Sequence, residues 1–194
     1  MIGVDEVGRG CLAGPLLVVA ARQKGKEPKG LNDSKKLTRR QRETIYDLLI
    51  ANYQFGEGWV RPAEIDRRGL TGAMRLGIVR ALKQLDVRYE EDIILDGPIN
   101  YFSARYKKVE CLIDADAAIP LVSAASVYAK VRRDRFMATL ADRYPQYGFD
   151  RHVGYGTPEH LRAIDKFGAL RHIHRQLFAP VSRLNQAVSW RLLA

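Results

Sequence analysis

Two short apolar runs at the start of the chain, joined by a glycine-rich turn, constrain the fold more than any other feature. Residues 1–5 and 16–22 are rich in Val, Ile and Leu, a composition that favours β-strands. The apolar stretch at 16–21 is far too short to cross a bilayer. We therefore predict a strand that ends in two acids, Asp5 and Glu6, then a turn over Gly8-Arg9-Gly10, and then a second strand.

Helix and strand signals alternate along the rest of the chain. Further strands are predicted at residues 53–60, 92–96 and 108–113, and helices at 71–85 and 121–143. Loops are predicted at 24–36 and 145–156, and a last amphipathic segment at 182–193. The mixture indicates an α/β fold. We predict a single domain over residues 1–194, with a core to about residue 145 and a C-terminal extension over about 146–194.

Two helix starts carry capping signals. Thr38 is a good N-cap, and Gln41 three residues later completes a capping-box pattern. Thr157 and Pro158 predict a second start, with Thr as the cap and Pro in the first turn, and Gly168 predicts the end of that helix.

Composition narrows the class of partner. Lys and Arg outnumber Asp and Glu by 32 to 22, and the formal charge of +10 favours a polyanion such as nucleic acid. Cys11 and Cys111 belong to no zinc or redox motif and fit a reducing compartment. No signal-peptide pattern precedes the first strand. We expect a cytoplasmic monomer that does not contact membranes.

Four acids in separate parts of the chain are candidate metal ligands. Asp5 and Glu6 end the first strand, Asp96 ends an otherwise apolar strand, and Asp116 lies in Asp114-Ala115-Asp116. An unpaired carboxylate at such a position is costly for the core. Mg²⁺ prefers hard oxygen ligands, and two such ions together can activate a water and stabilise a leaving oxygen.

Strand geometry complicates the first pair of acids. Neighbouring strand residues point to opposite faces, so Asp5 and Glu6 cannot both point inward from a regular strand. Either the backbone bulges at this point or Glu6 contributes indirectly. The fourth acid also has alternatives: Asp114 is close by, and Asp134 lies in a run of arginines where a surface ion pair is the simpler interpretation.

These motifs, in their order and spacing over about 180 residues, closely resemble the blocks of the ribonuclease HII family. The resemblance is carried by Val4-Asp5-Glu6-Val7-Gly8-Arg9-Gly10, Asn32-Asp33-Ser34-Lys35-Lys36-Leu37, Leu95-Asp96-Gly97, Ala115-Asp116 with Ile119-Pro120, Ser123-Ala124-Ala125-Ser126, Gly154-Tyr155-Gly156-Thr157 with His160, and His174-Arg175 with Phe178.

The resemblance implies an RNase H-like fold, in which helices flank a central mixed sheet and a helical extension follows. It implies cleavage of RNA in RNA·DNA hybrids and incision 5′ to single ribonucleotides in duplex DNA, leaving 3′-hydroxyl and 5′-phosphate ends. Such activity serves ribonucleotide removal in DNA replication and repair. Asp5, Glu6, Asp96 and Asp116 fall on the positions that hold two Mg²⁺ or Mn²⁺ ions. The related type HIII enzymes carry an extra N-terminal domain, which a catalytic strand starting at residue 1 disfavours.

Substrate contacts also follow from the resemblance. Recognition of the 2′-hydroxyl falls to Gly8, Arg9 and Gly10, where two glycines let the backbone approach a sugar. Tyr155 falls at the junction between ribonucleotide and deoxyribonucleotide. Ser34 and Lys35 are candidates for a backbone phosphate. The side chains proposed for phosphate binding or for support of the site are Lys130, His174 and Arg175.

The chain departs from the family's pattern in one place. Asp114 stands where many bacterial members have Lys, which places an anion beside the predicted metal ligand Asp116. In the tail, residues 186–190 faintly resemble a replication-clamp peptide, although an ordinary amphipathic helix is the simpler interpretation.

Two other functions fit parts of the sequence. A noncatalytic nucleic-acid-binding domain would bind duplexes with strong salt dependence and need no metal. A junction-resolving or transposase-type nuclease of the same fold would need no 2′-hydroxyl, and the Gly-Arg-Gly turn argues against it.

Overall fold

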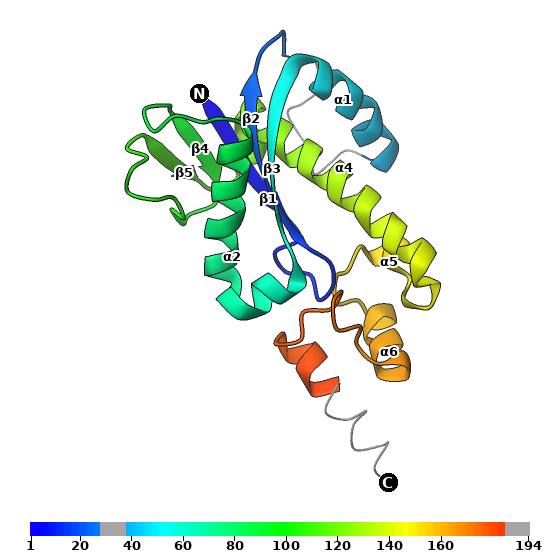
Figure 1. Ribbon diagram of the computed structural model, residues 1–194. Helices are drawn as coiled ribbons and strands as arrows, with labels where there is room; N and C mark the ends of the chain where they lie inside the picture. Colours follow the sequence, from blue (N-terminus) through cyan, green and yellow to red (C-terminus); the bar gives the residue numbers. More distant parts are fainter. Residues whose placement is uncertain (28–37, 185–194) are drawn as a thin grey trace. The chain divides into compact units, whose positions relative to one another are not determined.

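We describe residues 1–27 and 38–184 of the chain in a computed structural model (Figure 1). These residues divide into two compact units. Unit 1 comprises Met1–Val7, Leu17–Trp59 and Met74–Arg132, and unit 2 comprises Gly8–Leu16, Val60–Ala73 and Arg133–Ala194. The prediction of a single domain over residues 1–194 stays a prediction.

Unit 1 is built on a five-stranded mixed sheet in the order β3-β2-β1-β4-β5. Strand β1 pairs antiparallel with β2 and parallel with β4, and β4 pairs parallel with β5. The strands are β1 (Ile2–Val7), β2 (Leu16–Gln23), β3 (Tyr53–Val60), β4 (Ile93–Asp96) and β5 (Val109–Leu112). The sheet confirms the predicted mixed α/β fold and every predicted strand.

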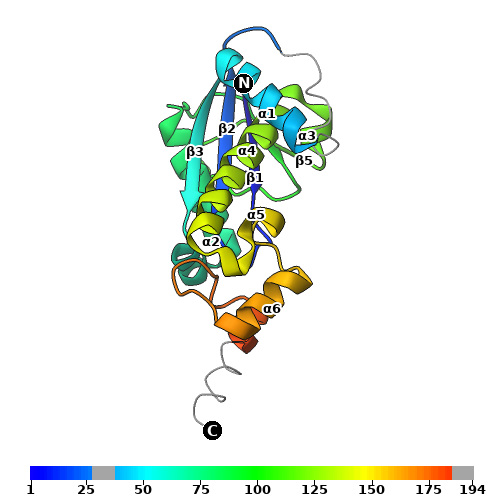
Figure 2. The same cartoon turned by 90° about the vertical axis from the view of Figure 1, so that its right-hand side faces the viewer.

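Helices cover both faces of this sheet (Figures 1 and 2). The helical elements are α1 (Arg39–Asn52), α2 (Pro62–Gln84), α3 (Ala115–Ala118), α4 (Pro120–Arg143), the 3-10 turn η1 (Pro145–Tyr147), α5 (Phe149–His152) and α6 (Pro158–Phe167). Within unit 1, α1 and α4 lie on one side of the sheet, and α2 lies on the other. Residues 179–184 of unit 2 are also helical.

Side chains of β2 and α4 form the core on one side of the sheet. Leu17, Val19 and Ala21 of β2 pack against Ala124 and Ala125 of α4, and all five are fully buried. The small residues of α4 therefore allow the helix to pack closely against the sheet.

A second close contact joins α2 to β3 through glycines. A β-carbon built on Gly58 would lie 1.9 Å from the carbonyl oxygen of Gly77, and one on Gly56 would lie 2.0 Å from that of Ala81. Any larger residue would push the helix away from the strand. The glycines thus set the distance between α2 and β3.

Two predicted elements differ from the structure, and a third lies mostly outside the described residues. Helix α2 begins at Pro62 rather than residue 71, because Gly69, with φ of +67°, joins two helical segments into one element. The predicted loop at 145–156 contains η1 and α5. Of the amphipathic segment predicted at 182–193, residues 185–193 lie outside the described residues.

Candidate active site

Asp5 is a buried carboxylate near the end of β1. It is 6% exposed, and its Oδ1 accepts a hydrogen bond of 2.7 Å from the backbone N–H of Glu6. The Ser126 side chain of α4 also hydrogen-bonds to Asp5. Gly3, on the same face of the strand, lies directly under the backbone of Leu121 at the start of α4. The strand and the helix together therefore fix where this carboxylate points.

Glu6 follows Asp5 without a bulge. Each residue from Gly3 to Val7 has one partner on β2, so over these pairs the register is regular. The alternation of a regular strand then directs the Asp5 and Glu6 side chains to opposite faces. Of the two alternatives that the sequence leaves open, a local bulge is absent from this register.

Asp96 and Asp116 come together from neighbouring elements. Asp96 ends β4, and its Oδ1 accepts hydrogen bonds from the backbone N–H groups of Ala115, at 2.7 Å, and Asp116, at 3.5 Å. These N–H groups belong to the first turn of α3, whose orphan donors need acceptors. Asp96 thereby fixes α3, and with it the position of Asp116.

Burial separates Asp116 from Asp114. Asp116 is 2% exposed, whereas Asp114 is exposed and adopts a left-handed conformation with φ of +55° before α3. The other alternative, Asp134, lies in unit 2 on α4. Of these three acids, only Asp116 is buried, and Asp96 accepts a hydrogen bond from its backbone N–H.

Negative charge accumulates around Asp5. Burial raises the pKa of Asp5 well above its usual range, and the neighbouring carboxylates of Glu6 and Asp96 raise it further. The hydrogen bond from Ser126 opposes this shift. A divalent cation would relieve the repulsion, so the charge and the hard oxygen donors fit such an ion. Over residues 1–27 and 38–184, no three His, Cys, Asp or Glu side chains stand at metal-binding distances.

The Gly8-Arg9-Gly10 turn belongs to unit 2. Gly8 has φ of +86°, and a β-carbon there would lie 2.2 Å from Nε of Arg133, so both conformation and space require glycine. The backbone N–H of Cys11 closes the turn by donating to the Gly8 carbonyl at 3.4 Å. Gly10 is exposed, and nothing lies within 4 Å of a β-carbon built on it.

Tyr155 lies in the loop between α5 and α6. Its side chain is 41% exposed, and it hydrogen-bonds to the Cys11 side chain. Its backbone carbonyl is bound by the Nδ1 atom of His160 at 2.8 Å. Tyr155 therefore presents part of its ring to solvent from a fixed backbone, as a ring that contacts a nucleotide requires.

Two buried histidines, His160 and His174, lie next to each other, and the first contacts the Tyr155 backbone. The backbone N–H of Leu170 donates to Nδ1 of His174 at 2.9 Å, so a neutral His174 carries its proton on Nε2. That atom lies 3.1 Å from Nε2 of His160, which must accept and so carries its own proton on Nδ1, facing the Tyr155 carbonyl. Burial lowers the pKa of His160 to about 4 and that of His174 to about 3. Both rings are therefore neutral near pH 7.

A family model described as Ribonuclease HII matches residues 2–181 of the chain. The chain belongs to the ribonuclease HII family. This is a family of metal-dependent nucleases, and the predicted resemblance is confirmed.

Curated ribonuclease HII proteins match nearly the whole chain. The protein from Ralstonia pickettii (strain 12J) is 42% identical over 195 residues, covering 97% of this chain and 82% of its own length. The protein from Rhodopseudomonas palustris (strain BisA53) is 41% identical over 181 residues, covering 93% of this chain. The chain spans just under two thirds of that relative's length, 64%.

Solved structures agree with the fold. Ribonuclease H2 from Pyrococcus horikoshii OT3 has a TM-score of 0.77 at 26% identity and covers 97% of this chain and 98% of its own. The RNase HII of a PCNA complex from Archaeoglobus fulgidus has a TM-score of 0.76 at 25% identity, covering 95% and 96%. Bst-RNase HIII in complex with Mn²⁺ shares the fold at 22% identity, with a TM-score of 0.69 and coverage of 98% and 70%. The chain thus has the predicted RNase H-like fold.

Among the predicted ribonuclease HII residues, Ser34 and Lys35 lie outside the described residues. Ser126, which hydrogen-bonds to Asp5, is a supporting residue that sequence reasoning missed as part of the site. The sequence places Ser126 only in the Ser123-Ala124-Ala125-Ser126 block of the resemblance, and the signal that could have found its role is its hydroxyl in an otherwise alanine-rich stretch. Arg175 is predicted to bind phosphate or to support the site, and its side chain is fully buried, which argues against direct contact with a phosphate.

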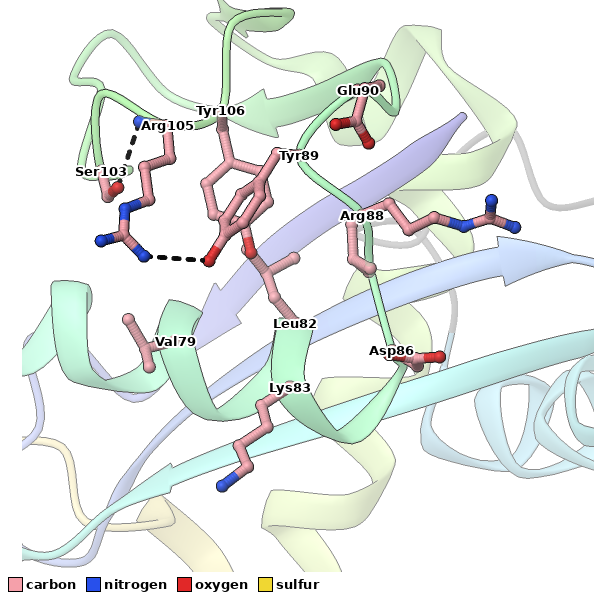
Figure 3. A pocket seen from close by; sticks show the side chains of 11 residues that line it. Val79, Leu82, Lys83, Asp86, Arg88, Tyr89, Glu90, Ser103, Arg105 and Tyr106 are labelled. Carbon is pink, nitrogen blue, oxygen red and sulfur yellow. Dashed lines mark hydrogen bonds between the residues drawn. The ribbon is translucent and has the colours of Figure 1, made fainter.

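A cavity of unit 1 contains none of the predicted site residues (Figure 3). It has a volume of about 610 Å³ and lies between the end of α2 and the turns at 86–90 and 103–106. The ring of Tyr89, the guanidinium of Arg105 and the Val79 side chain face it. Cations and anions alternate along its wall, as Lys83 and Arg88 stand beside Asp86 and Glu90. The acids of the candidate active site are therefore separate from this cavity.

Proposed function

We propose that this protein cleaves the RNA strand of RNA·DNA hybrids and incises duplex DNA on the 5′ side of single ribonucleotides. The observation that carries the proposal is the set of carboxylates that β1, β4 and α3 contribute in a chain of the ribonuclease HII family. The formal charge of +10 is consistent with a nucleic-acid substrate. Such a substrate would be met in the cytoplasm during DNA replication and repair.

Asp5, Asp96 and Asp116 would hold divalent cations. Glu6, whose side chain leaves β1 on the opposite face, would contribute indirectly. Two Mg²⁺ or Mn²⁺ ions bound there would lower the pKa of an attacking water and offset charge on the leaving oxygen. Ser126 orients the Asp5 carboxylate, and Asp96 orients Asp116 through α3. In-line attack by water would give inversion at phosphorus and leave 3′-hydroxyl and 5′-phosphate ends.

The Gly8-Arg9-Gly10 turn, which follows Asp5 and Glu6 in the chain, would recognise the ribose. Gly8 comes two residues after Glu6, so the chain itself keeps their Cα atoms within about 8 Å. Backbone groups of Gly8, Arg9 and Gly10 would bond the 2′-hydroxyl, the group that distinguishes RNA from DNA. Tyr155 would pack at the junction with the following deoxyribonucleotide. Ser34 and Lys35 would hold a backbone phosphate.

The hybrid activity is tested with an end-labelled RNA strand presented in three ways: paired with DNA, paired with RNA, and single-stranded. We expect cleavage of the RNA·DNA hybrid alone, with Mg²⁺ or Mn²⁺ and not with EDTA. Asp96→Asn should abolish cleavage and retain or improve hybrid binding, because it removes like-charge repulsion with phosphate. A folded wild-type protein that binds the hybrid in both metals without cutting it would favour the noncatalytic binding domain.

A further inference from the structure

Arg175 is a fully buried cation that binds the backbone of the Gly8-Arg9-Gly10 turn. Its Nη1 donates to the Arg9 carbonyl at 2.7 Å, and its Nη2 donates to the carbonyl of Gly8 and, at 3.2 Å, to that of Gly14. Its backbone N–H donates to the Leu12 carbonyl at 2.8 Å. Both the backbone and the side chain of Arg175 are therefore anchored to residues 8–14.

A guanidinium can only donate hydrogen bonds, so a buried one needs converging acceptors. Burial lowers the pKa of Arg175 to about 10, which leaves it charged near pH 7. Charge-assisted hydrogen bonds of this kind are roughly twice as strong as neutral ones. The direction of the Gly8 and Arg9 carbonyls is thus held more firmly than loop contacts alone would hold it.

The orientation of one carbonyl fixes the N–H group of the same peptide. In a trans peptide the C=O and the N–H point in opposite directions. Because the Arg9 carbonyl points at Arg175, the Gly10 N–H points away from it. Gly10 is exposed, and in the described part of the chain its N–H has no hydrogen-bond acceptor. The turn therefore presents a fixed, polarised donor to open space.

We propose that Arg175 is a positioning residue for ribose recognition, which holds the Arg9–Gly10 peptide so that the Gly10 N–H donates to the 2′-oxygen of a ribonucleotide. The inference rests on the proposed function for its substrate. It assigns Arg175 no contact with nucleic acid, because its side chain is fully buried. It predicts that removing this side chain weakens the discrimination of ribose from deoxyribose.

Arg133 offers a matched control in the same unit. It is also fully buried, and it donates to the carbonyls of Pro15, Val153 and Ala13 at 2.8, 2.8 and 3.1 Å. None of these carbonyls belongs to the turn. Arg133→Met and Arg175→Met therefore remove equally buried guanidinium groups, but only the second frees the Arg9–Gly10 peptide. Arg175→Lys retains the charge and one donor group, and should rescue part of the effect.

The first test measures positioning without any substrate. We expect ¹⁵N relaxation of the Gly10 amide to show a rigid backbone in the wild-type protein and in Arg133→Met, and a mobile one in Arg175→Met. Circular dichroism establishes that each variant is folded, and Arg175→Lys replaces Arg175→Met if the latter unfolds. A Gly10 amide that stays as rigid in the Arg175 variant as in the wild type would overturn the proposal.

The second test measures discrimination. Fluorescence anisotropy in EDTA compares a DNA duplex carrying one ribonucleotide with the same all-DNA duplex. Loss of one hydrogen bond should reduce the wild-type preference for the ribonucleotide by roughly three- to tenfold in Arg175→Met and leave it intact in Arg133→Met. An unchanged preference in Arg175→Met would contradict the proposal. If the wild type shows no preference and no cleavage, the proposed function fails, while the amide measurement still decides whether Arg175 positions the turn.

Discussion

Burial distinguishes acids near the candidate site that have the same side chain. Asp114 and Asp116 have the same side chain two positions apart, yet the first is exposed and the second is 2% exposed. A buried carboxylate without compensation is costly, which indicates a bound cation or a specific partner. The resemblance favours Asp116, which stands four residues before Pro120 in the matching motif, and burial adds an independent physical reason.

This contrast gives a matched pair of substitutions. We expect Asp116→Asn to reduce cleavage of an RNA·DNA hybrid by at least about 100-fold, the scale on which loss of one stabilising group at a reaction centre acts. Asp114→Asn should change the rate by less than about threefold, because an exposed side chain is easily replaced. Steady-state rates in Mg²⁺ measure both. A larger loss in Asp114→Asn than in Asp116→Asn would reverse the assignment.

Sequence could predict the acids but not their supports. Asp5 and Asp96 end apolar strands, a position that is visible in the sequence. The Ser126 bond to Asp5 and the carbonyl contacts of Arg175 depend on tertiary placement. Backbone carbonyls leave no residue-specific signal, so sequence alone could not predict that a buried arginine binds them.

Element boundaries were predictable where a cap marks them. The Thr38–Gln41 capping box, the Thr157 cap and the Gly168 end of α6 are all confirmed. The start of α2 was missed because residues 62–70 lack the apolar stripe used to place it. Pro62 in the first turn and Glu64, which accepts from the Arg61 N–H at 2.9 Å, are the local signals that mark this start.

The glycine contact between β3 and α2 yields a stability prediction. Gly58→Ala should destabilise the protein by about 1–3 kcal/mol, because its β-carbon would overlap the Gly77 carbonyl. That corresponds to a fall in Tm of roughly 2–4 °C per kcal/mol for a chain of this size. Gly10→Ala is the control, since its β-carbon enters open space. Calorimetry that gave both variants the same Tm would show that the glycine contact does not set the packing.

At the scale of the whole molecule, the buried histidines link stability to pH. The unfolded chain titrates its histidines near 6.5, whereas the folded His160 and His174 have pKa values of about 4 and about 3. Below pH 6.5 the unfolded state therefore binds more protons. The stabilisation is fully present above that pH and is lost as the pH falls toward 4, by up to about 1.4 kcal/mol per pH unit for each histidine.

Urea unfolding between pH 7.5 and 5 measures this dependence. A His160→Gln, His174→Gln double variant should lose most of the slope, whereas His172→Gln, at an exposed position, should retain it. An equal slope in the wild type and the double variant would place the pH dependence elsewhere in the molecule.

The net charge and the hydropathy of the helices bear on the partners of the molecule but not on its reaction. The formal charge of +10 favours a polyanionic partner. Among the described residues, we find no helical segment that combines the length and hydropathy of a membrane span. The monomeric state stays a prediction, and so does clamp binding by residues 186–190, which lie outside the described residues.

The central claim is that the carboxylates of this chain direct a metal-dependent cut at a ribonucleotide. The most direct measurement is strand cleavage of a DNA duplex carrying one ribonucleotide, beside the all-DNA duplex, with Mg²⁺, Mn²⁺ or EDTA. The account predicts a single cut on the 5′ side of the ribonucleotide, dependent on metal and absent from the all-DNA duplex. Cleavage of both duplexes alike, or no cleavage by a folded protein that binds the duplex in both metals, would contradict it.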